Sequence, residues 1–224
     1  MLQTLLLVSA LLVADNQGDD AAKARPLEGL AKAGVGAVIS SILETPASVG
    51  GVQLDLKKQF LELSDVKIAN PKKFTEGDAI SVKKIRVEAD PKLLFSEEPV
   101  IRLIQVSGGT VNAEQTVSHG MNLKKLLDSA SRMKGSKPRK DGSKKKWRIE
   151  KAIIDDCTAN ITSELLTRNT TQKKLDHIEM NFMGQDNKGM TTDAAVSRVL
   201  ETLIDKLGLF EGGGAAPLIN LLGR

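Results

Sequence analysis

The amino-acid sequence predicts an α+β fold: a curved antiparallel β-sheet, open like a groove, flanked by an N-terminal, a mid-chain and a C-terminal amphipathic helix. Two observations predict it. Short runs rich in Val and Ile alternate apolar with polar residues and are bounded by Asn, Asp, Pro and Gly, as in antiparallel strands. Other segments carry apolar residues at helical spacing. With 41% hydrophobic and 27% charged residues, the chain has the composition of a folded domain.

The same periodicities place the elements in order along the chain. Pro26 favours the first turn of a helix, an apolar stripe follows it, and Thr45-Pro46 ends that helix. Gly208 ends the last helix. The expected elements are a helix over 26–43, a strand over 49–56, strands over 60–68, 80–87, 100–106 and 110–114, a helix over 121–133, strands over 147–154, 158–166 and 173–182, and a helix over 192–207.

The apolar alternation changes phase inside two of these runs, between Leu63 and Val66 and again between Val82 and Ile85. A period of two switches parity only at a bulge, at a bend or where both faces are buried. We therefore expect a strongly curved sheet, with one face packed under helices and the other closing over a groove.

The two ends of the chain differ in composition from its centre. Residues 1–14 are an apolar run too short to span a bilayer, which takes about 20 residues. The run suits a secretory signal peptide, although no basic residue precedes it; an amphipathic or buried N-terminal helix is the alternative. We expect a flexible mature N-terminus over 15–25, a single domain over 26–210 and a flexible tail over 211–224. A signal peptide would export the protein to the periplasm or cell envelope.

The net charge of +4 is concentrated in a Gly-, Ser- and Pro-containing loop over 134–146, which we expect to be disordered. Near an anionic membrane each basic residue adds about 1 kcal/mol of attraction. A solvated linker is the alternative, and nucleic acid is disfavoured because stacking aromatic residues are scarce. The residues expected to contact an anionic surface are Lys134, Lys137, Arg139, Lys140, Lys144, Lys145 and Lys146.

No motif for catalysis or metal binding stands out. The single cysteine, Cys157, excludes an intramolecular disulfide and a Cys-based zinc site within one chain. A nucleophile–base pair would need Cys157 beside His119 or His177, and nothing in the spacing joins them. Asp155-Asp156 has the oxygen ligands of a hard cation, but such a pair is more often solvated at a strand end. We expect no enzyme, cofactor or metal site.

An ordered series of short motifs over about residues 27–127 resembles the AsmA-like family of bacterial envelope proteins. The positions that carry the resemblance are Asn70-Pro71 with Phe74, Val87 with Asp90, Leu93-Leu94, the strand pair over 101–114, and Asn122-Leu123 opening a helix. The family often has Gly before that Phe, where this chain has Lys73. The Asn70-Pro71 pair is itself expected to be structural, because Asn tolerates turns and Pro fixes φ.

The resemblance implies an open-groove β module without catalytic residues that handles lipid or supports outer-membrane assembly or maintenance. Its expected ligand is phospholipid or another amphiphile, held by apolar groove residues; plain core is the alternative for each of them. The competing function is a periplasmic scaffold that recruits an envelope protein partner through an exposed sheet edge. An open apolar groove would favour lipid, and a groove filled by helix side chains would favour the partner. The groove residues are expected to be Val82, Ile101, Leu103, Val111 and Ile178.

Overall fold

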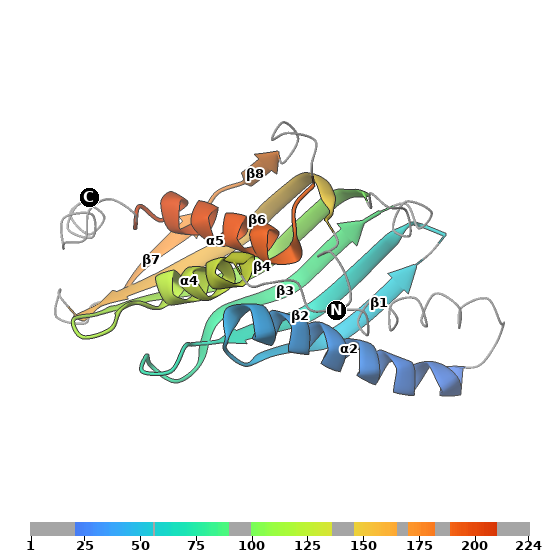
Figure 1. Ribbon diagram of the computed structural model, residues 1–224, viewed down its shortest axis with the longest axis horizontal. Coiled ribbons are helices and arrows are strands. Elements are labelled where there is room, and N and C mark those ends of the chain that lie inside the picture. Colours follow the sequence, from blue (N-terminus) through green and yellow to red (C-terminus); the bar gives the residue numbers. More distant parts are fainter. Residues whose placement is uncertain are drawn as a thin grey trace.

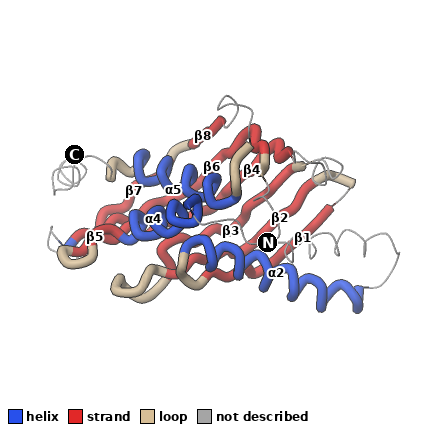
Figure 2. Tube along the Cα trace, viewed as in Figure 1, coloured by secondary structure: helices blue, strands red, loops and turns tan. Residues whose placement is uncertain are grey.

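The protein is an open, curved β-sheet with helices on one face, which confirms the predicted α+β class (Figures 1 and 2). The computed structural model describes residues 21–55, 57–89, 100–135, 146–164, 170–181 and 189–209. The elements are α2 (Ala21–Leu43), β1 (Ala47–Asp55), β2 (Phe60–Ala69), β3 (Asp78–Glu88), β4 (Val100–Thr116), β5 (Gly120–Met121), α4 (Asn122–Gly135), β6 (Arg148–Ser163), β7 (Thr170–Leu175), β8 (Ile178–Asn181) and α5 (Thr192–Lys206).

The strands are ordered β1-β2-β3-β4-β6-β7, with β5 paired to β4 and β8 paired to β6. Neighbours are antiparallel except β4 and β6, which are parallel. This pair is parallel because α4 carries the chain back to the starting end of β4 before β6 begins. Because β7 and β8 pair with successive halves of β6, together they form one edge of the sheet, while β1 forms the other.

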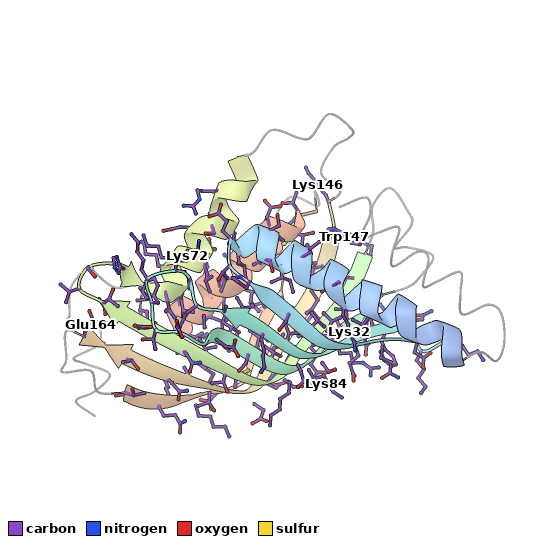
Figure 3. All side chains as sticks on the ribbon, turned by 90° about the horizontal axis from the view of Figure 1, so that it is seen from below. Lys32, Lys72, Lys84, Lys146, Trp147 and Glu164 are labelled. Atoms are coloured by element: carbon purple, nitrogen blue, oxygen red, sulfur yellow. The ribbon has the colours of Figure 1, made fainter. Side chains whose placement is uncertain are left out.

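The helices α2, α4 and α5 lie on the inner side of the bend, and the strands bow away from them (Figure 3). The core between the layers is built from Leu, Ile, Val and Ala, as the shortage of aromatic residues requires. Leu123 and Leu126 of α4 and Leu203 and Ile204 of α5 are almost fully buried there. Asn122 and Ser197 are buried with them and are hydrogen bonded.

The strand boundaries differ from the prediction in three places. The runs predicted over 100–106 and 110–114 form one strand, β4, and those over 147–154 and 158–166 form β6. Conversely, the strand predicted over 173–182 is divided into β7 and β8 at Asp176-His177. The turn-like residues Ser107-Gly108 and Asp155-Asp156 therefore lie inside continuous strands.

A single crease crosses the whole sheet at aligned positions. Residues that face the helices are two apart along each strand, except at one step where they are three apart. Cross-strand partners on either side of this step share a face, so the step is continuous from β1 to β7 and β8. The helix-facing residues that flank it are Val49 and Val52, Leu63 and Val66, Val82 and Ile85, Val106 and Gly109, Ile154 and Cys157, and Leu175 and Ile178.

The backbone at the crease explains the change of phase in β2, β4 and β6. Asp65, Gly108 and Asp156 have φ of 49°, 66° and 52°, a left-handed conformation that reverses the alternation. Gly50 permits the close approach of β1 to β2 at the crease, because a Cβ atom there would lie 2.8 Å from the Cβ of Asp65. The two phase changes seen in the sequence are thus the places where β2 and β3 pass through the same crease.

The predicted end segments are described only in part. α2 begins at Ala21 and not at Pro26, so it includes the last part of the segment expected to be flexible. Lys134 and Gly135, placed in the basic loop, belong to the end of α4. Residues 1–14 and 211–224 lie outside the described residues. Among the helices that are described, none has the length and apolar character needed to cross a membrane.

Candidate functional site

Two rows of apolar side chains cross the sheet on its helix-facing side, and we call them the apolar rows. Each row takes one residue from each of six strands, because directly paired residues share a face. In sheet order the first row is Leu54, Leu61, Val87, Ile104, Ala152 and Met180, and the second is Val52, Leu63, Ile85, Val106, Ile154 and Ile178.

Burial of the apolar rows changes from one edge of the sheet to the other. On β6 and β8 the row members are 2–7% exposed and belong to the core. On β1 to β4 every member except Leu63 is only half-buried. The helix-facing surface of β1–β4 therefore carries an aliphatic area that is less completely covered than the core beside it.

A polar row borders the apolar rows at the end of the sheet where β4 begins. In β4, Arg102 lies two residues before Ile104 and so points to the same face. Its Nη2 atom donates a hydrogen bond to Oε1 of Gln59 at 2.7 Å. Ala89 lies between these two residues and is 7% exposed. Glu150, half-buried, is the next residue of this row on β6. An exposed guanidinium thus lies beside the apolar rows.

The opposite face of the same strands carries charged pairs. Lys84 points away from the helices (Figure 3), and its Nζ atom lies 3.2 Å from Oε1 of Glu62. Arg86 pairs with Glu88 at 2.9 Å, and its guanidinium lies 3.9 Å from the centre of the Phe60 ring. The two faces of β1–β4 therefore differ in chemistry: the helix-facing side is aliphatic in the apolar rows, whereas the other side is mixed, with charged pairs on β2 and β3 beside Phe60 and, on β4, Ile101 and Leu103.

The five residues predicted to form a groove are divided between the two faces. Val82, Val111 and Ile178 face the helices and are 9%, 3% and 4% exposed, inside the core. Ile101 and Leu103 are half-buried and have the opposite parity to Ile104 and Val106, so they point to the other face. The structure does not bring the five together on one surface.

Most members of the apolar rows on β1–β4 were not singled out from the sequence. Their alternation was visible, but the face to which each half of a strand points depends on the crease. The phase change between Val82 and Ile85 is the signal in the sequence that could have shown that both halves of β3 place their apolar residues on the same face. Using it also requires the pairing register, which is a property of the folded sheet.

The basic loop contributes little to the described surface. Of its seven cationic residues, Lys134 is described only as helical backbone at the end of α4, and Lys146 is exposed. Lys137, Arg139, Lys140, Lys144 and Lys145 lie outside the described residues. Lys146 immediately precedes Trp147, which bridges to Met190 beside the start of β6 (Figure 3).

At the other end of the sheet, buried amides join the motif residues of the resemblance. Asn122 is 0% exposed and its Nδ2 atom donates to Oδ1 of Asn70 at 2.8 Å and to the carbonyl of Asn112 at 2.6 Å. Its Oδ1 atom accepts from the backbone N–H of Glu114 and of Leu123. This network ties β4 and the turn after β2 to the start of α4, which is a structural role for the Asn70 position.

The possible catalytic residues lie in different surroundings. Cys157 faces the core, and burial raises the pKa of its thiol. His119 lies in the turn before β5, with its ring 6.4 Å from the ring of Phe74. His177 is exposed between β7 and β8, where its Nδ1 atom lies 2.6 Å from Oδ1 of Asp155. In the part of the chain that is described, no three His, Cys, Asp or Glu side chains are grouped as metal ligands.

The two edges of the sheet differ in how they are protected. β7 carries Lys173 and Lys174 and stops at Asp176-His177. From Val49 to Asp55, β1 contains no Lys, Arg or Pro, the residues that commonly block strand addition. At its start the backbone N–H of Ala47 is bonded to Oγ of Ser40 in α2.

Comparison with known proteins gives no further constraint: no protein-family model, no curated protein and no solved structure matches this chain.

Proposed function

We propose that this chain is a non-enzymatic module of the cell envelope that binds lipid or another amphiphile and supports outer-membrane assembly or maintenance. The apolar rows support the binding activity, because they offer a continuous aliphatic surface that is half-buried on β1–β4. The resemblance to AsmA-like proteins in the motifs around Asn70-Pro71 and Asn122-Leu123 supports the location in the envelope.

The dimensions of this surface suit an acyl chain. Strands lie about 4.8 Å apart, so the three steps from β1 to β4 span about 14 Å. One leaflet of a bilayer has a hydrocarbon thickness of about 15 Å, half of the ~30 Å core. Each methylene removed from water contributes about 0.8 kcal/mol, so covering half of a ten-carbon chain contributes about 4 kcal/mol before the cost of ordering it.

Native mass spectrometry of protein purified from a lipid-containing host tests this proposal, with lipid extraction of the same sample. The informative variant replaces Ile85 and Val87 by Gln, because both face the helices on β3 and are half-buried. The matched control replaces Lys84 and Arg86 by Gln on the other face of the same strand. Circular dichroism establishes that each variant folds.

Co-purifying phospholipid that is retained in the control and lost in the Ile85/Val87 variant is the expected result. A clean mass with no uptake from supplied lipid would overturn the proposal. Equal loss in both variants would also overturn it, because the effect would then not be specific to the apolar rows.

A second candidate function is recruitment of a protein partner by strand addition at β1. The observation that favours it is the edge itself, whose residues from Val49 to Asp55 include no Lys, Arg or Pro. Amide hydrogen exchange separates the two candidates. An added strand slows exchange of β1 amides in an envelope extract relative to buffer, whereas lipid on the apolar rows leaves the edge amides of β1 unchanged.

A further inference from the structure

We propose that Arg102 recognises an acidic headgroup, so that the preferred ligand of the apolar rows is an anionic amphiphile carrying a phosphate or carboxylate. This inference rests on the proposed function and specifies its ligand class. It begins from position: Arg102 and Ile104 are two residues apart on β4, about 7 Å along the strand, and point to the same face.

The contact between Arg102 and Gln59 defines where the guanidinium lies. Its Nη2 atom lies 2.7 Å from Oε1 of Gln59, the residue immediately before β2. Ala89, the residue immediately after β3, lies between them and donates its backbone N–H to the Gln59 carbonyl. Ala89 itself is only 7% exposed. The guanidinium is therefore held across the end of the apolar rows while the Arg102 residue remains exposed.

Arg102 and Gln59 together favour binding of an anion on the side of Arg102 that faces Gln59. A guanidinium presents five N–H donors in a planar fork that matches carboxylate and phosphate oxygens. The Gln59 amide accepts from Arg102 through its oxygen, so its NH₂ group adds two donors beside the cation. Glu150 lies on the opposite side of Arg102, toward β6, so an anionic headgroup is expected on the Gln59 side.

An amphiphile seated here would place its acidic group against Arg102 and Gln59 and its chain along the apolar rows of β1–β4. A neutral amphiphile would use the apolar rows alone. Charge-assisted hydrogen bonds are roughly twice as strong as neutral ones, so we expect at least a tenfold preference for the anionic ligand.

Isothermal titration of the full chain with three twelve-carbon probes tests the inference. The probes are dodecyl phosphate, dodecanoate and dodecyl maltoside, each below its micelle concentration. The variant is Arg102→Gln. The matched control is Arg86→Gln, which removes the same charge from the other face of the sheet.

Wild-type protein and Arg86→Gln are expected to bind one or both anions at least tenfold more tightly than the maltoside, and Arg102→Gln should bind all three alike. Preference for dodecyl phosphate alone identifies a phosphate headgroup, and equal preference for both anions extends the class to carboxylates. Equal affinity of the wild type for all three probes would overturn the role of Arg102 and leave the proposed function standing. If Arg86→Gln also loses the preference for the anionic probes, the preference would arise from the net charge of the protein and not from the position of Arg102, and the inference would be overturned. Binding of none of the probes would overturn both.

Discussion

Nδ2 of Asn122, at the start of α4, lies 2.8 Å from Oδ1 of Asn70, in the turn after β2. The two residues are 52 positions apart in the sequence. Asn122 also donates to the carbonyl of Asn112 on β4 and accepts from two backbone N–H groups. One fully buried amide thus fixes the position of a helix relative to the sheet.

We predict that Asn122→Ala lowers the free energy of unfolding by about 2–4 kcal/mol, because it leaves several buried hydrogen-bonding groups without partners. Urea unfolding followed by circular dichroism measures the change. Asn181→Ala is the control, since Asn181 is exposed and bonded only to Glu179 among the contacts described. A loss below about 1 kcal/mol for Asn122→Ala would show that the network is not a significant source of stability.

Gly109 faces Cys157 across β4 and β6, and a Cβ atom at Gly109 would lie 2.5 Å from the Cys157 Sγ atom. We predict that Gly109→Ala costs about 1–3 kcal/mol through overpacking. In a Cys157→Ala background the nearest side-chain atom would be 3.6 Å away, an ordinary contact, so the same substitution should cost less than about 1 kcal/mol. A double-mutant cycle from thermal unfolding measures this coupling. Equal costs in the two backgrounds would refute the steric explanation.

Lys73 has φ of 81° in the turn between β2 and β3, at the position where AsmA-like proteins often have Gly. Because a left-handed conformation is strained for residues with a Cβ atom, Lys73→Gly should stabilise the protein by about 0.5–1 kcal/mol. The neighbouring Lys72→Gly is the control and should be neutral or destabilising, since Lys72 has no positive φ. Differential scanning calorimetry compares the two; equal shifts would contradict the prediction.

His177 and Asp155 form a pH-dependent contact between β6 and the junction of β7 and β8. The hydrogen bond to Asp155 is the main cause that raises the pKa of His177 above its usual value, with Glu179 adding to it. Because the folded pKa is the higher one, this contact stabilises the protein fully below the unfolded pKa of about 6.5. The stabilisation is lost as the pH rises through the folded pKa.

Urea unfolding should therefore show that the free energy of unfolding of the wild type falls as the pH rises through the folded pKa of His177, and that this fall is absent in His177→Gln. An NMR titration of Asp155→Asn should give a lower His177 pKa than in the wild type. If His177→Gln leaves the pH profile of stability unchanged, the contact does not contribute to it.

The sequence was sufficient to predict most elements of the fold because their periodicities are local. The phase changes at Leu63–Val66 and Val82–Ile85 also revealed the crease in β2 and β3. In β4 and β6 the same crease is formed by Gly108-Gly109 and Asp155-Asp156, which resemble turns, so each strand was divided in two. The parallel pairing of β4 with β6 depends on the return of the chain through α4, which no local pattern encodes.

The candidate site could be predicted only as a type of surface. Apolar residues on the strands indicated an aliphatic face, but assigning a residue to it requires the strand register and the crease. Val82 and Ile101 were therefore grouped together although they point to opposite faces. Arg102 was not singled out, because its place beside Ile104 and its contact with Gln59 exist only after β2, β3 and β4 have paired.

The crease also links the lengths of the strands to one another. A single residue inserted into β3 between Ile85 and Glu88 would move every later side chain of that strand to the wrong face and out of register with β2 and β4. A matching insertion in each neighbour would be needed to restore the pairing, and then in their neighbours, across to both edges. Changes in chain length should therefore be tolerated only in the connections between strands, because the helix-facing residues of all these strands depend on one shared register.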